Sequence, residues 1–183
     1  IMMDAQDNIY LCINDGVSAK IRKIDTNGTM STFAGSDKVA TPTGENVDKL
    51  NAKFKWPSSL TFDSSGNMYV IDREHSIRKI SSTGVITTLA SISGKDLSAT
   101  PQTVPTLPVG PVSALAFSAE KNKLYFDGWN RKIYSYDLGT NQVALLNIPD
   151  LTMGVVNTLV VKGNYLYIVD QMNNIIVKYN LNS

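Results

Sequence analysis

Three aspartates recur at one place in a repeated pattern and are the first residues to consider for chemistry. Asp72, Asp127 and Asp170 each end an apolar run rich in β-forming residues, and Asp15 is a looser match. Grouped carboxylates can ligate a divalent cation or serve as general acid and base. Because these recur once per repeat, we favour a structural role, in which each accepts backbone N–H bonds from the loop that follows it. Asp63, in a predicted turn, is interpreted in the same way.

Histidine and cysteine are too scarce for most catalytic or metal-binding arrangements. The chain has one histidine, His75, and one cysteine, Cys12. A zinc site of the usual kind needs three or four such ligands, and a hydrolase needs a nucleophile beside a base. The sequence has no Gly-x-Ser-x-Gly elbow, Gly-rich phosphate loop or EF-hand spacing. We therefore expect no catalytic residue, metal site, cofactor or internal disulfide, and a buried apolar role for Cys12.

The overall charge gives no argument for binding by bulk electrostatics. The 183 residues include 17 Lys and Arg against 16 Asp and Glu, a net charge of +1. Charge therefore indicates neither nucleic acid nor an anionic membrane as a partner. No apolar run approaches the roughly 20 residues of a membrane-spanning helix, so no membrane span is expected.

The elements that would position the aspartates follow an internal repeat. Tyr69 and Tyr125 lie 56 residues apart, as do Ile24 and Ile80, and Ile80 and Tyr136. Each unit contains short runs of β-branched and aromatic residues, and no long window shows the helical period. A period of roughly 40 to 55 residues with four strands per unit is typical of an all-β propeller built of four-stranded antiparallel blades.

The second unit resembles an NHL repeat. It runs from Trp56-Pro57-Ser58-Ser59-Leu60 through Asp63-x-x-Gly66-Asn67-Met68-Tyr69-Val70-x-Asp72 to Ile77-Arg78-Lys79-Ile80. The resemblance covers about the whole chain and is weaker in the last two units. It implies a β-propeller, commonly six-bladed, in which the first strand of each blade lies innermost. Pro57 and Gly66 are then structural repeat positions.

We predict four blades separated in two places by inserts. The blades lie at about 1–35, 54–90, 109–146 and 154–183, and the inserts lie at 36–53 and 91–108. The last unit stops after its third strand, and an open sheet edge favours association. We therefore expect part of a larger, six-bladed propeller that needs further blades or another chain to close. The chain starts at Ile1 with no visible signal peptide, so we expect a fragment.

Loops that differ from blade to blade are the predicted binding residues. Between the second and third strands, successive units read Arg73-Glu74-His75, Gly128-Trp129-Asn130-Arg131 and Gln171-Met172-Asn173-Asn174. In the resembled fold these loops share a face with the inserts. Trp129 either contacts a sugar or protein partner, or packs between blades. We predict binding through Arg73, His75, Trp129, Asn130, Arg131, Gln171 and Asn173, and a core position for Trp56.

Basic pairs also recur at matched places. They are Arg22-Lys23, Arg78-Lys79 and Arg131-Lys132. Some NHL propellers bind RNA through a basic face. The near-neutral total charge and the lack of aromatic residues beside these pairs argue against RNA. We interpret the pairs as solvated charges on strands or edges and do not expect a nucleic-acid partner.

The prediction from the sequence is a non-catalytic interaction or structural scaffold module. It would bind protein or glycan through the inter-blade loops, as part of an extracellular or cell-surface assembly. One alternative is a lactonase-like propeller hydrolase or lyase with a metal in the central channel, and another is an RNA-binding NHL domain. Asn27-Gly28-Thr29 is an N-glycosylation sequon, although a hairpin turn is the preferred interpretation.

Overall fold

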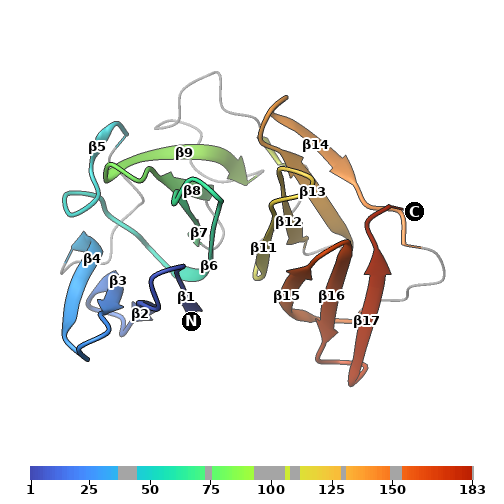
Figure 1. The fold of residues 1–183 in the computed structure, drawn as a ribbon, viewed down its shortest axis with the longest axis horizontal. Coiled ribbons are helices and arrows are strands. Elements are labelled where there is room, and N and C mark those ends of the chain that lie inside the picture. The colour runs from blue at the N-terminus through green and yellow to red at the C-terminus, as the bar shows by residue number, and fades with distance from the viewer. Residues whose placement is uncertain are drawn as a thin grey trace.

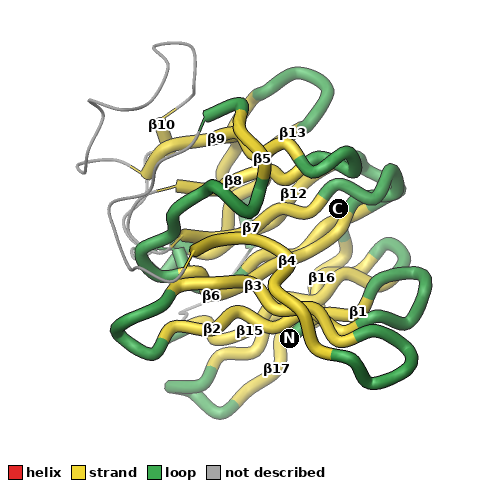
Figure 2. The backbone as a smooth tube through the Cα atoms, turned by 90° about the vertical axis from the view of Figure 1, so that its left-hand side faces the viewer, coloured by secondary structure: helices red, strands yellow, loops and turns green. Residues whose placement is uncertain are grey.

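All regular structure in the described residues is β-strand. The structure, a computed structural model, describes residues 1–36, 45–72, 76–92, 106–107, 112–128, 131–148 and 154–182. Within these residues Figure 2 shows strands joined by loops and no helix. No helix that could cross a membrane is therefore found in this part of the chain. The β-branched and aromatic runs of the repeat form the strands, as their β-propensity predicts.

The strands form four sheets in chain order (Figure 1). The first sheet contains β1 (Met2–Met3), β2 (Ile9–Asn14), β3 (Ala19–Ile24) and β4 (Met30–Ser36). The second contains β6 (Pro57–Phe62), β7 (Met68–Asp72), β8 (Ser76–Ile80) and β9 (Val85–Ile92), and β5 (Val47–Asp48) and β10 (Thr106–Leu107) also pair with β9. The third contains β11 (Leu115–Ser118), β12 (Lys123–Asp127), β13 (Ile133–Asp137) and β14 (Gln142–Leu145). The fourth contains β15 (Val156–Lys162), β16 (Tyr165–Asp170) and β17 (Ile175–Asn180).

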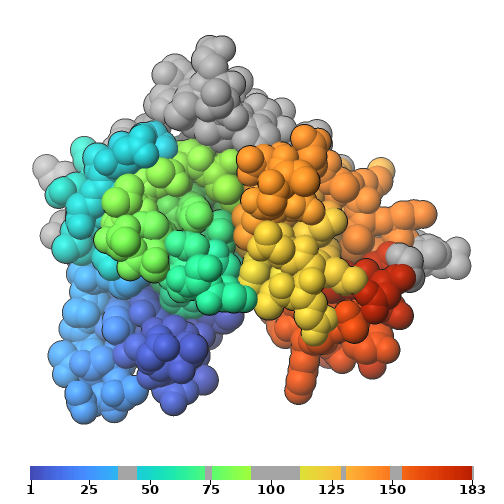
Figure 3. Space-filling model, turned by 45° about the horizontal axis from the view of Figure 1, so that its top comes forward, coloured from blue at the N-terminus to red at the C-terminus, as the bar shows by residue number. Residues whose placement is uncertain are grey.

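The sheets are arranged around a central hollow as the blades of a propeller. β6 contacts β2 on one side and β11 on the other, and β11 contacts β15. The first and fourth sheets, blue and red in Figure 3, flank the second and third. Apart from β10, which runs parallel to β9, the paired strands are antiparallel. The prediction of an all-β propeller is therefore confirmed, with three strands described in the fourth blade.

Each pair of neighbouring sheets encloses its own hydrophobic core. Because side chains alternate along a strand, Met68 and Val70 of β7 pack toward the first sheet, while Tyr69 and Ile71 pack toward the third. A third cluster, which includes Leu166, joins the third and fourth sheets. All five residues of β7 are buried, because this strand is covered on both faces.

The segment between the first and second sheets ties the two together. We expected an insert over 36–53, and its described part contains β5, which extends the second sheet beside β9. The Lys49 carbonyl accepts the Gly35 amide at 2.9 Å, and the Lys49 amide donates to the Gly84 carbonyl at 2.9 Å. One residue therefore bonds to both sheets. Most of the second expected insert, 91–108, lies outside the described residues.

Candidate functional site

Neutral polar and apolar side chains line the central hollow. Its volume is about 490 Å³, and β6, β11 and β15 contribute most of its wall, together with Ile1 and Met2. Its polar lining consists of Ser58, Ser59, Thr61, Ser113, Asn157 and Thr158. Hydroxyl and amide groups can hydrogen-bond a polar ligand without carrying charge. The described lining includes no carboxylate, histidine or lysine that could serve acid–base or metal chemistry.

Two serines of this lining differ in their contacts. Ser59 Oγ accepts the Leu115 amide at 3.2 Å and so joins β6 to β11. Ser58 Oγ is buried and has no hydrogen-bond partner among the described residues. An unsatisfied buried hydroxyl costs about 1–3 kcal/mol.

The recurring aspartates act as clamps within their own blades. Asp72 ends β7 and Asp127 ends β12, and both carboxylates are buried. At 2.6–3.1 Å, Asp72 accepts the amides of Lys55 and Trp56, and Asp127 accepts those of Ser113 and Ala114. Each carboxylate therefore fixes the segment that leads into the innermost strand of its blade, through charge-assisted hydrogen bonds.

Asp170 combines this clamp with the loop contacts predicted from the sequence. It accepts the Gly154 amide at 2.6 Å from the segment before β15. It also accepts the amides of Met172 and Asn173 at 3.1 and 3.2 Å, and the Asn173 side-chain amide at 2.8 Å. From the sequence we expected the donors only in the loop after each aspartate. The segment before the first strand is the source that it missed.

Burial and hydrogen bonding give two of these carboxyls opposite pKa shifts. Burial raises the pKa of Asp72 to about 6, although the amides of Trp56 and Lys55 and the charge of Arg78 oppose the shift. Burial also acts to raise the pKa of Asp170, but its hydrogen bonds from Gly154 and Asn173 outweigh this and hold the pKa below its usual value. A carboxylate that its own blade satisfies in this way has little capacity left for a metal ion.

A second type of aspartate closes the turn between the first and second strands of a sheet, β1–β2 in the first sheet and β6–β7 in the second. Asp63 accepts four donors at 2.7–3.0 Å: the amides of Ser65 and Asn67, the Asn67 side chain and the Tyr69 hydroxyl. Asp4 accepts the matching set from Gln6, Asn8 and Tyr10 in the first sheet. Asp4 was not predicted from the sequence, although both turns share the pattern Asp-x-x-x-Asn-x-Tyr.

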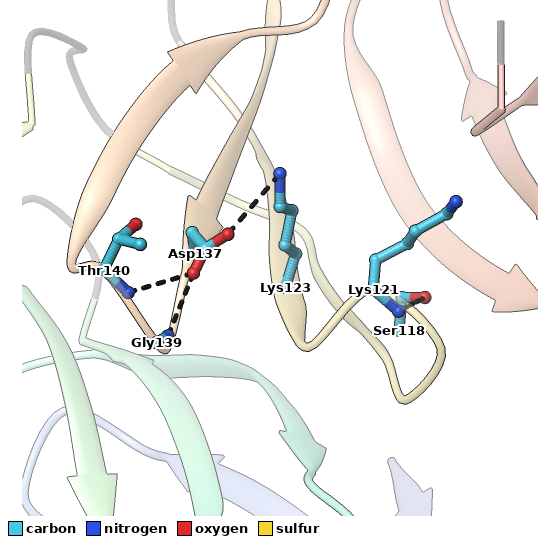
Figure 4. A network of polar contacts seen from close by, with 6 residues as sticks. All are labelled: Ser118, Lys121, Lys123, Asp137, Gly139 and Thr140. Atoms are coloured by element: carbon cyan, nitrogen blue, oxygen red, sulfur yellow. Dashed lines mark hydrogen bonds and ion pairs between the residues drawn. The ribbon is translucent and has the colours of Figure 1, made fainter.

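A serine replaces this aspartate in the third sheet. Ser118 Oγ accepts the Lys121 amide at 3.3 Å (Figure 4). Figure 4 also shows the β13–β14 turn, where Asp137 accepts the amides of Gly139 and Thr140 at 2.9 and 3.0 Å. Lys123 Nζ lies 3.6 Å from Asp137, so this turn also carries an ion pair. The turns are therefore built from short side-chain-to-backbone bonds.

A second hollow, of about 310 Å³, lies where the innermost strands meet these turns. Its lining includes the carboxyl groups of Asp63 and Glu120 and the hydroxyls of Ser64 and Ser118. Burial acts to raise the pKa of Asp63, but the hydrogen bonds from Asn67 and Tyr69 outweigh it, and the pKa is lowered. Asp63 is thus an anion already satisfied by its own turn. In the described part of the chain, no three His, Cys, Asp or Glu side chains gather where they could hold a metal ion.

Arg78 contradicts the prediction of solvated basic pairs. Its side chain is only 1% exposed, and its Nη2 lies 3.3 Å from Glu45 Oε1. Glu45 also accepts the Thr88 amide at 2.9 Å and the Thr88 hydroxyl. A buried guanidinium is tolerated only with a partner, and here the partner comes from the segment between the first two sheets. No local pattern in the sequence signals the pairing with Glu45.

The predicted binding residues fall into two groups. Arg73, His75, Trp129 and Asn130 lie outside the described residues. Arg131, Gln171 and Asn173 are exposed, on the loops that follow β12 and β16. Arg131 adopts a φ of 61°, which is uncommon for a residue with a side chain. The Asn173 side chain donates to Asp170, so it shapes its loop, whereas the Gln171 amide donates to the Val155 carbonyl at 2.9 Å.

Trp56 is not a core residue. It is 54% exposed, while Phe54 and Pro57 beside it are buried. The predicted repeat positions lie at structural landmarks. Pro57 begins β6, where a strand tolerates a missing amide, and Gly66 adopts a φ of 77° in the β6–β7 turn.

Asn27 and Cys12 lie in ordinary structural positions. Asn27 is exposed in the β3–β4 turn, where its amide donates to Asp25 and Gly28 has a φ of 81°. The predicted turn is therefore present, and its asparagine is accessible. Cys12 is half-buried on β2 against the core between the first two sheets. Burial raises the pKa of its thiol to about 12.

Comparison with known proteins supports the fold and no particular family. No protein-family model matches the sequence, and no curated protein matches it. The resemblance to NHL repeats therefore stays a prediction.

Several solved propeller structures share the fold at low sequence identity. The computationally designed protein Ika8 matches with a TM-score of 0.54 and 16% identity, over 98% of this chain and 45% of its own. A chain of the nidogen/laminin complex matches with a TM-score of 0.56 and 14% identity, over 97% of this chain and 73% of its own. A structural-genomics protein named as a candidate gluconolactonase matches with a TM-score of 0.63 and 10% identity, over 98% of this chain and 61% of its own. The chain thus spans less than half the length of the first of these proteins. Identities this low carry the fold and not the function.

Proposed function

We propose that this chain is a non-catalytic propeller scaffold that binds a protein or glycan partner. The main support is that the described residues lining the central hollow carry no charged side chain. General acid–base catalysis and metal-assisted hydrolysis need titratable or anionic side chains at the reacting position. The described wall offers hydroxyl, amide and apolar groups, which suit binding.

The state of the repeated aspartates supports the same proposal. Asp72, Asp127 and Asp170 are buried and accept backbone amides of their own blades. A group that is used once per blade to hold the backbone serves the architecture. We therefore assign these three residues to the scaffold and not to a catalytic site.

The partner is proposed to bind the loops that follow β7, β12 and β16, the second strands of the second, third and fourth sheets. Among the described residues, Arg131 and Gln171 present exposed side chains there. A propeller of the same fold occurs in the nidogen/laminin complex, which is an assembly of proteins. The undescribed residues Arg73, His75, Trp129 and Asn130 belong to this proposed face by their place in the repeat.

Binding to immobilised glycans and extracellular proteins tests the proposal. We expect Arg131→Ala and Gln171→Ala to weaken binding by about threefold to tenfold each, with unchanged unfolding midpoints. Lys162→Ala is the matched control, because Lys162 is exposed at the opposite end of its blade, beside the β15–β16 turn. Equal binding by all three variants would reject this face as the binding surface.

A lactonase-like hydrolase is the second candidate function. The candidate gluconolactonase of similar fold and the carboxyl groups of Asp63 and Glu120 beside the smaller hollow favour it. Lactone hydrolysis that depends on added divalent cation and is lost in Glu120→Gln would establish this function in place of the first. RNA binding is less favoured, because Arg78 of the matched basic pairs is buried.

We also propose that the module belongs to an NHL-type propeller completed by further blades or by another chain, outside the cell or at its surface. The exposure of Ile175 and Ile176 on β17, at 44% and 70%, supports an additional neighbour there. Asn27 is accessible for glycosylation in such a compartment. Mass determination of the native assembly and of its reduced, denatured chain tests both points, since it reports associated chains and attached glycan together.

A further inference from the structure

A groove between the first and second sheets is separate from the central hollow. Its volume is about 830 Å³, and its rim includes the Asp4 turn, the Asp63 turn and Ser81 and Ser82 of the β8–β9 turn. This size lies within the roughly 300–1,000 Å³ of ordinary ligand sites. The groove lies at the opposite end of β7 from the loops of the proposed function. The inference therefore goes beyond that function and does not depend on it.

Lys49 is held in this groove by both sheets. Its backbone bonds to Gly35 and Gly84 fix its position, each at 2.9 Å. Its Nζ lies 3.8 Å from the centre of the Phe33 ring. The ammonium group is thus placed over an aromatic face, and no hydrogen bond from it to a described residue is found.

Lys23 brings a second cation to the same groove. It lines the groove from β3, opposite Tyr10 of β2. Burial lowers the pKa of Lys49, and the charge of Lys23 lowers it further, although Asp48 opposes both effects. Neither lysine forms a salt bridge with a described residue. Burial leaves the Lys49 ammonium incompletely solvated, and a bound oxyanion would restore charge-assisted hydrogen bonds to it.

The groove's carboxylates do not serve as acceptors for these lysines. Asp4 and Asp63 each accept four donors from within their own turns. Four donors match the approximate lone-pair capacity of one carboxylate. The charged groups of the groove that can still form hydrogen bonds are therefore the lysine ammonium groups. These are donors, so the ligand must supply the acceptor.

The remaining lining suits a hydroxylated ring. Ser64, Ser65 and Gln6 add neutral polar groups that can bond hydroxyls, and Met3 and Phe62 add apolar surface for C–H groups. An inorganic anion alone would use the lysines and leave the rest of the groove empty. A saccharide ring that carries an acidic group uses both kinds of surface.

We propose that the groove between the first two sheets binds a saccharide bearing an oxyanion, with Lys23 and Lys49 bonding the anion. The anion is either a uronic carboxylate or a phosphate on the sugar. The serines and Gln6 bond the ring hydroxyls.

Amide-detected NMR titration of the isotopically labelled chain tests this with four probes: glucuronic acid, glucose 6-phosphate, glucose and inorganic phosphate. We expect the first two to shift the amides of Ser64, Ser65 and Ser82, and the stronger of them identifies the anion. Glucose should bind at least about tenfold more weakly, because it lacks the charge-assisted bonds. Inorganic phosphate should also be weaker than glucose 6-phosphate.

Lysine variants localise the binding. Lys23→Gln and Lys49→Gln should each weaken it by about fivefold to tenfold, and Lys49→Arg should retain it if the charge is what matters. Lys178→Gln is the matched control. Lys178 Nζ also lies over an aromatic ring, 4.0 Å from the centre of the Tyr165 ring, but in the fourth sheet. Equal binding of glucose and the acidic sugars, equal binding of inorganic phosphate and glucose 6-phosphate, or unchanged affinity in both lysine variants would overturn the proposal. None of these outcomes bears on the loops at the opposite end of the blades.

Discussion

Removal of the Arg78 charge should destabilise the whole propeller. Arg78 is buried, and its guanidinium pairs with Glu45, which also bonds Thr88 of β9. In Arg78→Met the stem of the side chain still fills the core, but Glu45 loses its cation. The variant thus tests whether the ion pair holds the segment before β5 against the second sheet.

The structure sets the expected size of the effect. Breaking a buried ion pair by removing one partner costs about 3–5 kcal/mol. Glu45 is 24% exposed, so water offsets part of the loss and we expect about 3 kcal/mol, at the low end. Glu45→Gln keeps an oxygen for the Thr88 amide and should cost less, about 1–2 kcal/mol. Against a typical total of about 5–15 kcal/mol, the loss in Arg78→Met is large.

Urea unfolding monitored by tryptophan fluorescence measures these differences. Arg22→Met is the matched control, since Arg22 occupies the equivalent place in the first sheet but makes an exposed bond to the Ser31 carbonyl. We expect the control to cost about 1 kcal/mol or less. If Arg78→Met cost no more unfolding free energy than Arg22→Met, the buried ion pair would not be what stabilises this part of the propeller.

Three further predictions concern single residues. Gly35→Ala should lower the unfolding free energy by about 2 kcal/mol or more, because the new Cβ would lie 2.6 Å from the Ala19 carbonyl oxygen. Gly28 also has a positive φ but lies in open space, so Gly28→Ala should cost about 1 kcal/mol. Urea unfolding of both variants measures the difference. Burial raises the pKa of Cys12, so iodoacetamide should label the native thiol far more slowly than the urea-unfolded one, as mass spectrometry would show. The folded pKa of Asp72 is about 6, above its unfolded value, so the wild type should gain stability relative to Asp72→Asn as the pH falls from about 7 to about 4; a constant difference in unfolding free energy across that range would contradict the shift.

Local sequence patterns predict the strands and turns of this fold well. The spacing of Tyr69 and Tyr125 indicated equivalent strands, and both residues lie at equivalent positions of β7 and β12. Gly66 marked a turn because its φ of 77° favours glycine. These features depend on a few neighbouring residues, which is why periodicity and turn chemistry reveal them.

Contacts between distant segments were not predictable in the same way. Arg78 looked like a surface charge because its partner, Glu45, lies in a segment outside the repeat pattern. Trp56 looked like a core residue because tryptophan is usually buried, but Phe54 takes the core position and Trp56 faces outward. The groove with Lys23 and Lys49 arises from two sheets packed together, so no single motif signals it.

We propose that the repeated aspartates hold the propeller together and are not metal ligands. The most direct test is the unfolding free energy of the wild type and of Asp127→Asn, each with and without millimolar Ca²⁺. Asn weakens the two 2.7 Å bonds to the amides of Ser113 and Ala114, so we expect a loss of about 1–3 kcal/mol that Ca²⁺ leaves unchanged. Stabilisation by Ca²⁺ in the wild type that disappears in Asp127→Asn would contradict the claim and assign the aspartate to a metal site.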